Sequence, residues 1–325
     1  MKVLFVYKHK RTFVENDIKI LSKHYDVTPF FFSGLRCIPK LLLELHKTDI
    51  IFIWFASYHA FITSILSKKP KIVVTGGYDV AGEREIKYGL MLRPTTKRMV
   101  RYVLNKADKI LSVSYFNKKE LEKHLGITRS VVVYNGVDIE KFKPSKNIKK
   151  KKNLILTVGY VNKENWIRKG VFEFSSLAFY SRLKEKQYQF VVVGKVSQDV
   201  KNKIKYITEK TDNIRFMGYL PFEQLLTLYQ QAKVYCQLSY YESYGLAPAE
   251  AMACGCIPVV TEKTALPEVV GEKGFKVLYG TTQPVMQAIE VASKSDFDTR
   301  KHILDNFSLE KREEKLKEIL DEYTN

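Results

Sequence analysis

Short apolar runs and longer helical patterns alternate along the first part of the chain. Runs of strand length occur at Val3–Tyr7, Val27–Phe32, Ile50–Phe55, Ile72–Thr75, Ile110–Val113 and Val131–Tyr134. Segments with a helical apolar period lie between them, at Phe13–His24, Ile38–His46, Ala60–Ser67, Thr96–Asn105 and Lys118–Leu125. This alternation is typical of a parallel sheet with helices on both faces.

A second alternation follows a break in the pattern. Asn135-Gly136-Val137-Asp138 is a turn signal, and the lysine-rich stretch Lys141–Lys152 is typical of an interdomain linker. Apolar runs then return at Leu154–Val158, Phe190–Val193, Ile214–Met217, Val234–Leu238 and Ile257–Val260. Because 325 residues exceed what one core usually supports, we expect an α/β protein with two Rossmann-like, doubly wound domains facing a central cleft.

One segment has the length of a membrane span. Ile50–Ser67 contains no Asp, Glu, Lys or Arg over 18 residues. Its first six residues are β-branched or aromatic, Ala56-Ser57-Tyr58-His59 is polar enough for a turn, and a helical pattern follows. We therefore predict a strand, a loop and a helix rather than a span.

Composition narrows the class of protein. With 45% hydrophobic and 27% charged residues, the chain is neither disordered, nor collagen-like, nor a multi-span membrane protein. The net charge is +19, and residues 1–150 hold 29 basic but only 13 acidic residues. Such a balance points to an anionic partner, whether a nucleic acid, a membrane surface or a phosphorylated substrate. Only 12 of the 54 basic residues are Arg, so solvated surface lysines are an equal interpretation.

The spacing of the cysteines and the first residues of the chain predict the cellular compartment. Cys37, Cys236, Cys254 and Cys256 form no C-x-x-C pair and no metal spacing, which favours free buried thiols in a reducing cytoplasm. The first apolar run stops at Lys8, so we expect no signal peptide and a cytoplasmic protein.

Glycines follow three strands of the second half. Gly159, Gly194 and Gly218 each come directly after or at the end of an apolar run, which favours close backbone approach by a ligand at the carboxyl edge of the sheet. A plain strand-to-helix turn is the alternative. Neither G-x-G-x-x-G nor a P-loop is present, so a dinucleotide site is not expected.

The most informative stretch is Ser239–Val260, SYYESYGLAPAEAMACGCIPVV. Pro248 suits the first turn of a helix and Gly255 suits the residue just beyond its end. Gly245 then lies at a helix N-terminus, where free N–H groups and the dipole bind anions. Glu250, expected in the first turn, either complements the dipole or binds hydroxyls.

Two carboxylates lie beside this predicted anion site. Glu242 and Glu250 would repel a phosphate, but a carboxylate accepts two strong hydrogen bonds from a vicinal diol. A ribose and a hexose both offer such diols. The arrangement therefore points to a nucleoside diphosphate sugar.

The stretch resembles the E-x7-E signature of retaining family 4 glycosyltransferases (glycosyl transferases group 1) with the GT-B fold, through Glu242, Gly245, Leu246, Glu250, Ala251, Met252, Ala253, Gly255, Pro258 and Val259. Asn135–Asp138, Val158-Gly159 with Lys169-Gly170, Asn213–Leu220 and Ala265–Val270 resemble further motifs of that family. The resemblance implies a first domain over 1–147 that binds the acceptor, with helix 308–325 crossing back onto it. It implies a donor-binding domain over 148–307.

The resemblance also implies roles for single residues. Lys169, with Arg168, would hold the diphosphate, and Glu242 would contact the transferred sugar. Glu250 would bind the ribose. The other donor-binding positions would be Gly159, Gly194, Gly218, Tyr219, Leu220, Ser243, Tyr244, Gly245 and Leu246, and the weaker acceptor-side positions Gly77, Asp79, His59 and Lys8.

No cofactor and no metal is expected, and the donor would be a UDP-, GDP- or ADP-sugar. The one literal D-x-D, Asp296-Phe297-Asp298, is interpreted as a solvated helix N-terminus.

The chain departs from the family pattern at several points. Tyr160 stands where an Arg usually follows the glycine of the phosphate loop, and the stretch from Gly159 to Lys169 is longer than usual. Gly76 replaces the His of a T-x-H-G-x-D segment, and His59 is more typical of a structural histidine. After the first predicted strand, Lys8–Arg11 stands where the family has a glycine-rich loop.

Three functions remain open on the sequence. The first is transfer of a sugar to a glycan or lipid-linked acceptor, with the basic faces of Lys8–Arg11 and Thr96–Leu104 docking on an anionic membrane. A packed helix with a wet basic face is the alternative for the latter. The second is glycosylation of nucleic acid, which the shortage of Arg disfavours. The third is nucleotide-sugar binding without turnover.

Overall fold

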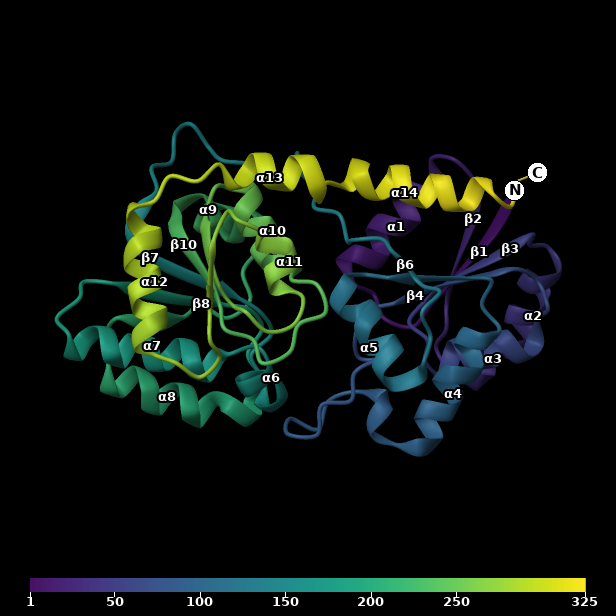
Figure 1. The fold of residues 1–325 in the computed structure, drawn as a ribbon, viewed down its shortest axis with the longest axis horizontal. Coiled ribbons are helices and arrows are strands. Elements are labelled where there is room, and N and C mark those ends of the chain that lie inside the picture. Colours follow the sequence, from purple (N-terminus) through teal and green to yellow (C-terminus); the bar gives the residue numbers. More distant parts are fainter. Residues whose placement is uncertain (325) are drawn as a thin grey trace. The chain divides into compact units, whose positions relative to one another are not determined.

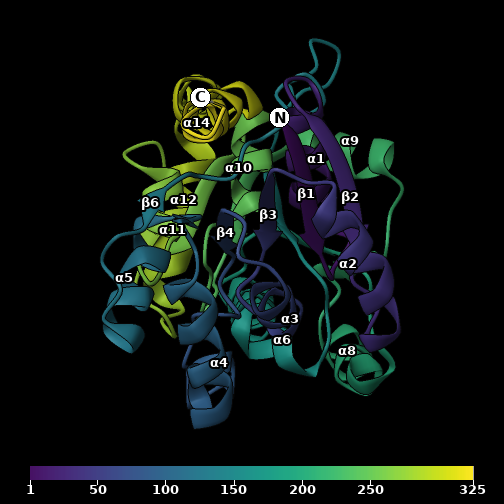
Figure 2. The ribbon, with the colours of Figure 1, turned by 90° about the vertical axis from the view of Figure 1, so that its right-hand side faces the viewer.

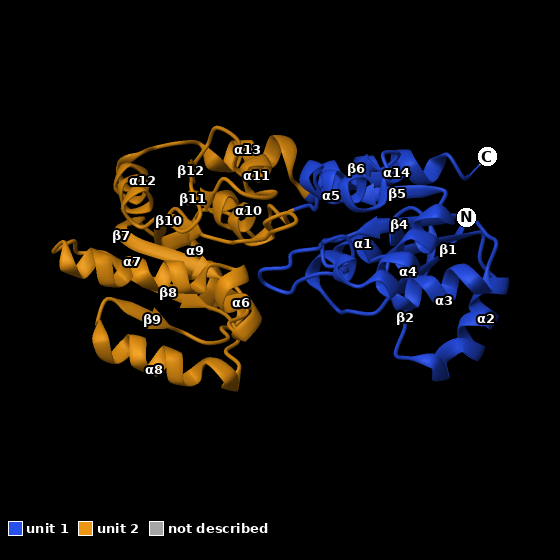
Figure 3. Cartoon of the chain, turned by 60° about the horizontal axis from the view of Figure 1, so that its bottom comes forward, with its two compact units in different colours: residues 1–136, 309–325 blue, residues 137–308 orange. Residues whose placement is uncertain are grey.

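Residues 1–324 are described in a computed structural model, which divides into two compact units (Figure 3). Unit 1 comprises residues 1–136 and 309–325, and unit 2 comprises residues 137–308. Residues 137–147 belong to unit 2 here, because Arg300 donates to the carbonyls of Ile139 and Phe142 at 3.1 and 2.9 Å. The sequence analysis had placed this segment in the first domain.

Unit 1 is a six-stranded parallel sheet in the order β2-β1-β3-β4-β5-β6. Figure 2 shows its first four strands side by side. Its elements are β1 (Lys2–Tyr7), α1 (Thr12–Ser22), β2 (Asp26–Phe31), α2 (Ile38–His46), β3 (Ile50–Trp54), α3 (Tyr58–Leu66), β4 (Lys71–Thr75), α4 (Pro94–Asn105), β5 (Lys109–Ser112), α5 (Tyr115–Leu125), β6 (Val131–Val132) and α14 (Leu309–Asp321).

Unit 2 repeats this architecture with a parallel sheet in the order β12-β11-β10-β7-β8-β9 (Figure 1). Its elements are β7 (Lys151–Val158), α6 (Lys163–Arg168), α7 (Val171–Leu183), β8 (Gln189–Val193), α8 (Lys201–Lys210), β9 (Ile214–Phe216), α9 (Phe222–Gln231), β10 (Ala232–Gln237), α10 (Leu246–Ala253), β11 (Ile257–Thr261), α11 (Leu266–Val270), β12 (Phe275–Val277), α12 (Gln283–Lys294) and α13 (Thr299–Asn306).

Burial explains why these segments form central strands. Every residue of β3, β4 and β11 is buried, as expected when helices cover both faces of a parallel sheet. The predicted alternation is confirmed, and α2 has the predicted bounds. Two strand predictions need correction: β6 pairs over two residues only, and β12 was not predicted.

The uncharged segment folds as the sequence predicted. It divides into β3, a turn and α3. Among residues 1–324, no helix is both long and apolar enough to cross a membrane. Cys236, Cys254 and Cys256 are free and buried, whereas Cys37 is free but only partly buried.

A buried ion pair joins α14, the last helix, to the rest of unit 1. Arg312 on α14 donates from Nε and Nη2 to the carboxylate of Asp17 on α1, at 2.5 and 2.7 Å. Trp54 donates its indole N–H to the same carboxylate at 2.7 Å, and Arg312 Nη1 reaches the carbonyl of Tyr134 at 2.7 Å. Both charged side chains are almost fully buried, so neither can be removed without leaving an unpaired buried charge.

We expect Arg312→Ala to lower the free energy of unfolding of unit 1 by about 3–5 kcal/mol, because it strands the Asp17 carboxylate. Chemical denaturation followed by Trp fluorescence measures the loss, since Trp54 contacts this pair. Lys315→Ala breaks the exposed pair with Glu318 on the same helix and should cost less than about 1 kcal/mol. Equal losses in the two variants would contradict this assignment.

Candidate functional site

The three glycines at the carboxyl edge of the unit 2 sheet lie on adjacent strands. Gly159, Gly194 and Gly218 follow β7, β8 and β9, which are neighbours in the sheet. Gly159 donates to the carbonyl of Val193 at 2.8 Å, and Gly194 donates to that of Gly218 at 2.9 Å. The edge is therefore a continuous backbone surface.

The glycines serve different purposes. A Cβ at Gly194 would lie 2.0 Å from the carbonyl oxygen of Gly159, so packing alone requires glycine there. A Cβ at Gly159 or Gly218 would meet nothing within 4 Å. Those two positions leave open space where a ligand can approach the backbone, as the sequence analysis expected for all three.

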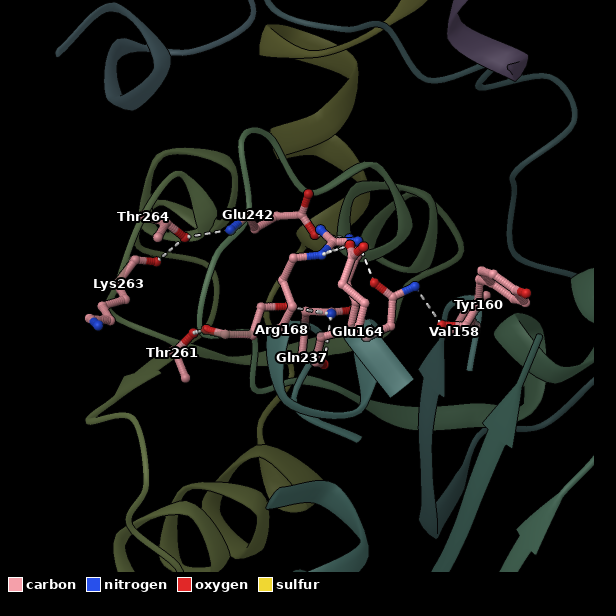
Figure 4. A network of polar contacts seen from close by, with 12 residues as sticks. Val158, Tyr160, Glu164, Arg168, Gln237, Glu242, Thr261, Lys263 and Thr264 are labelled. Carbon is pink, nitrogen blue, oxygen red and sulfur yellow. Dashed lines mark hydrogen bonds and ion pairs between the residues drawn. The ribbon is translucent and has the colours of Figure 1, made fainter. Parts of the chain in front are cut away.

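Lys169 and Glu242 form an ion pair. Figure 4 shows Glu242 in one network of polar contacts with Arg168, Gln237 and Thr264. Lys169 directly follows α6, and Glu242 lies in the loop between β10 and α10. Their side chains are 24% and 15% exposed, so a small molecule can reach the pair. The residue expected to hold the diphosphate and the residue expected to contact the transferred sugar thus lie in contact.

Arg168 bonds to two side chains of its own helix. Its Nε donates to Glu164 at 3.1 Å, and its Nη2 donates to the Asn165 side chain; both partners lie on α6. The charge of Arg168 also lowers the pKa of Glu242, so it supplies a second positive charge beside this carboxylate.

Backbone contacts hold both partners in place. The carbonyl of Lys169 accepts a hydrogen bond from Gln237 at 3.3 Å, and Gln237 is the last residue of β10. Thr264 Oγ1 accepts a hydrogen bond from the N–H of Glu242 at 3.2 Å, and the carbonyl of Glu242 accepts one from the N–H of Ala265 at 3.1 Å. The pair is therefore fixed by β10 on one side and the β11–α11 loop on the other.

Charge keeps Glu242 ionised. Burial alone would raise the pKa of Glu242, but Lys169 and Arg168 outweigh burial and hold that pKa below its ordinary value. Burial lowers the pKa of Lys169, and the attraction of Glu242 opposes that shift. A dianionic ligand beside Lys169 would compete with Glu242 for the ammonium group.

Helix α10 presents its N-terminus next to this loop. Gly245 precedes the helix with φ +105°, and the helix begins at Leu246. Ser243 and Tyr244 are buried in the loop before it. The first N–H groups of the helix have no intrahelical acceptor, which is the basis of anion binding at helix N-termini.

Glu250 lies in the second turn of α10, not in the first turn as predicted. It is therefore too far along the helix to complement the dipole, which acts within the first turn. Its carboxylate accepts a hydrogen bond from Tyr229 of α9 at 3.2 Å, and burial raises its pKa to about 7. A buried carboxylate with one neutral donor has capacity for further hydroxyl partners.

Tyr235 ties β10 to β7 inside unit 2. Its hydroxyl donates to Gln237 at 2.8 Å and accepts the N–H of Val158 at 3.2 Å. Burial raises the pKa of Tyr235 well above its ordinary value, and the charges of Glu250 and Glu242 add to this shift. The hydroxyl therefore stays protonated and keeps its hydrogen bond to Gln237.

Two exposed tyrosines border this region of unit 2. Tyr219, beside Leu220 in the loop after β9, is 77% exposed. Tyr160, which replaces the usual Arg, is 44% exposed, and its carbonyl accepts a hydrogen bond from Asn165 at 2.8 Å. Helix α6 therefore fills the longer stretch between Gly159 and Lys169.

The acceptor-side candidates lie in unit 1. Asp79 is buried, and its carboxylate accepts the N–H groups of Ala56 at 2.9 Å and Gly77 at 2.8 Å. His59 is buried too, with ring nitrogens 2.8 Å from the Trp54 carbonyl oxygen and 2.9 Å from Ser57 Oγ. Burial lowers the pKa of His59 to about 4, so it is a neutral structural histidine. Lys8 is exposed.

The ring of Phe55 fills the space beside Gly76. Phe55 has φ +71°, and its ring lies 2.1 Å from where a Cβ of Gly76 would be. Any side chain at residue 76 and this ring therefore exclude one another. His9 and Phe13 contact the ring edge-on, each with ring centroids 6.2 Å away.

Sequence reasoning missed several residues that support the site. Tyr229, Gln237, Thr264 and Asn165 hold the charged residues, yet they belong to no motif and only their contacts identify them. Asp298 caps α13 through the N–H of Lys301 at 2.9 Å, which confirms the helix N-terminus predicted at the D-x-D. Among residues 1–324, no three His, Cys, Asp or Glu side chains gather to hold a metal ion.

Two family profiles match the chain. The profile described as "Glycosyl transferases group 1" matches residues 138–303, and that described as "Glycosyltransferase Family 4" matches residues 4–141. A relative named GDP-mannose:cellobiosyl-diphosphopolyprenol alpha-mannosyltransferase, from Xanthomonas campestris, is 23% identical over 291 residues, which cover 86% of this chain and 72% of the relative. O-antigen chain mannosyltransferase B from Escherichia coli is 48% identical over 62 residues, covering 19% and 16%.

Solved structures show the same fold. HepE from Anabaena, in complex with UDP and glucose, has a TM-score of 0.78 at 16% identity, covering 99% of this chain and 100% of that one. Sucrose-phosphate synthase from Thermosynechococcus elongatus also has a TM-score of 0.78, at 14% identity, covering 99% and 98%. The shared architecture is the GT-B fold, as the sequence predicted.

The raised pKa of Glu250 predicts a pH-dependent stability. The folded protein keeps this proton up to about pH 7, whereas the unfolded chain loses it near the ordinary value of 4.5. The folded state therefore binds more protons between these two pH values, and stability falls as the pH rises through this window. Gln cannot ionise, so Glu250→Gln should not lose this stability. Between pH 5 and pH 8, its free energy of unfolding should rise relative to that of wild type by up to about 3 kcal/mol.

Glu272→Gln is the matched control, because Glu272 is exposed and pairs only with Lys276 four residues on. It should follow the wild-type pH profile. A Glu250→Gln profile parallel to wild type would show that Glu250 ionises normally.

Proposed function

The chain belongs to the glycosyl transferases group 1 family and is a family 4 glycosyltransferase with the GT-B fold, and on this basis we propose its substrates and mechanism. It transfers a hexose from a nucleoside diphosphate sugar to a glycan or lipid-linked acceptor. The anomeric configuration is retained and no metal is needed. Unit 2 binds the donor, and unit 1 binds the acceptor.

The observation that carries this proposal is the Lys169–Glu242 ion pair beside the N-terminus of α10. A departing nucleoside diphosphate gains negative charge, which a cation and free helix N–H groups stabilise. Lys169 and the amides of Gly245 and Leu246 are such groups. Arg168, which bonds to Glu164 and Asn165, adds a second positive charge beside Glu242.

The carboxylates have separate tasks in this proposal. Glu250, which has one hydrogen-bond donor in Tyr229, accepts the ribose hydroxyls. Glu242, once Lys169 turns to the phosphates, accepts hydroxyls of the transferred sugar. The open backbone at Gly159 and Gly218 and the loop of Tyr219 and Leu220 receive the phosphates and the base.

Mannosyl transfer is the first activity to test, because the relatives described above are named mannosyltransferases. We expect GDP-mannose to raise the melting temperature more than UDP-glucose or ADP-glucose does. Release of the nucleoside diphosphate from the same three donors then measures turnover. No binding and no turnover with any nucleotide sugar would overturn the proposal.

Two substitutions separate the roles of the glutamates. Glu250→Ala should weaken nucleoside diphosphate binding roughly 10- to 100-fold, because hydrogen bonds to a charged group are lost. Glu242→Ala should lower kcat for donor turnover far more than it changes the Kd of the nucleoside diphosphate. Calorimetry measures the Kd, and product release measures kcat. Glu272→Ala, in the same unit and exposed, should leave both unchanged.

Attachment to an anionic membrane through unit 1 is part of the proposal. Helix α4 buries Val100, Val103 and Leu104 and leaves Arg98 and Arg101 exposed, and Lys8–Arg11 is exposed too. Cations near an anionic bilayer contribute about 1 kcal/mol each. Sedimentation should therefore show tighter binding to anionic than to neutral vesicles, and equal binding would contradict attachment by charge.

A further inference from the structure

An apolar groove crosses the surface of unit 2 between α6, α7 and α8, which Figure 1 shows together at one end of that unit. Its volume is about 640 Å³. The apolar residues that line it are Trp166, Ile167, Phe172, Phe179, Tyr206 and Ile207. None of them takes part in the proposed sugar transfer.

Three of these side chains are unusually exposed. Ile167, Phe172 and Tyr206 are 48%, 55% and 62% exposed, although they come from three different helices. Single exposed apolar residues are common, but a contiguous group at the rim of a groove marks an interaction site. The groove therefore needs a partner with apolar surface.

Helix α6 creates the groove. This helix fills the stretch between Gly159 and Lys169 that is longer than the family pattern. Asn162 caps it through the N–H of Asn165 at 2.8 Å, and Trp166 is buried as the floor of the groove. The helix thus presents Ile167 to the groove, while Lys169, two residues further on, pairs with Glu242 of the proposed donor site.

Two lysines of α8 lie at the groove. Lys203 is among its lining residues and Lys210 lies over the ring of Tyr206, and both are exposed. Lys201 and Lys205 are also exposed on this helix, and Lys205 pairs with Glu209 at 3.8 Å. Lys203 Nζ lies 5.3 Å from the centre of the Trp166 ring, and Lys210 Nζ lies 5.9 Å from that of Tyr206. Aromatic rings bordered by lysines match the interface of an anionic bilayer, where apolar chains meet phosphate headgroups.

We infer that this groove docks on an anionic phospholipid bilayer, with Phe172 and Tyr206 entering the acyl region and the α8 lysines contacting headgroup phosphates. A second copy of the chain fits less well, because a two-fold contact through this face would bring the α8 lysines of both copies together. The inference concerns unit 2 and stands apart from the attachment proposed for unit 1.

Vesicle binding by the full chain tests the groove. Wild type should bind phosphatidylglycerol–phosphatidylcholine vesicles more tightly than pure phosphatidylcholine. Phe172→Gln/Tyr206→Gln should lose most of this binding, whereas Leu43→Gln/Ile65→Gln, equally exposed in unit 1, should keep it. Lys203→Gln/Lys210→Gln should weaken binding ~25-fold, about fivefold for each lysine.

A spectroscopic readout places the contact. The chain has two Trp residues: Trp54 is buried within unit 1, and Trp166 forms the groove floor. Brominated acyl chains should quench wild-type fluorescence on binding, and Trp166→Phe should abolish that quenching while the protein still sediments with the vesicles. Wild type that binds vesicles without quenching would overturn the inference.

Further outcomes separate this inference from its alternatives. If Lys97→Gln/Arg101→Gln on α4 loses binding while the Phe172→Gln/Tyr206→Gln protein binds like wild type, the groove is not the contact and attachment through unit 1 stands. A fall in sedimentation mass in Phe172→Gln/Tyr206→Gln would assign the groove to self-association. No vesicle binding by wild type would leave the groove to a protein partner and overturn the inference.

Discussion

Parallel pairing of β10, β7, β8 and β9 is the constraint on which the candidate site depends. Parallel strands bring their carboxyl ends to one edge, so segments far apart in the chain meet there. Lys169 follows α6, the helix that comes after β7, and Glu242 follows β10; β7 and β10 are neighbours in the sheet. Tyr235 and Gln237 on β10 bond to the backbone of Val158 and Lys169, which ties the two loops to the same pair of strands. Without this register the ion pair could not form.

The sequence contained most of the fold but less of the site. Buried strands such as β3 could be predicted because helices cover both faces, which makes the strand a continuous apolar run. Ile38–His46 could be predicted as a helix because its apolar residues recur at the helical period. β12 has only three residues, and α6 has six, too few for a period to be visible. Glu250 was placed one turn too early because the helix starts at Leu246, and local sequence does not fix that boundary.

Residues that support the site by contact were beyond sequence reasoning. Arg312 reads as one more charge on a polar helix, yet it is buried because Asp17, at the other end of the chain, accepts two of its hydrogen bonds. Phe55 reads as the end of a strand, yet its left-handed backbone turns its ring onto Gly76. The Phe55 ring therefore occupies the space that any side chain at residue 76 would need.

Unit 1 is built from both ends of the chain, so its last helix is synthesised only after all of unit 2. Unit 2 is continuous and can fold as it leaves the ribosome, whereas residues 1–136 must wait for α14. Until α14 arrives, Asp17 lacks its guanidinium partner, and the surface that Leu316, Ile319 and Leu320 will cover stays open. A chain that terminates just after residue 308 therefore carries a complete unit 2 and an incomplete unit 1, with exposed apolar surface of the kind that chaperones and proteases recognise.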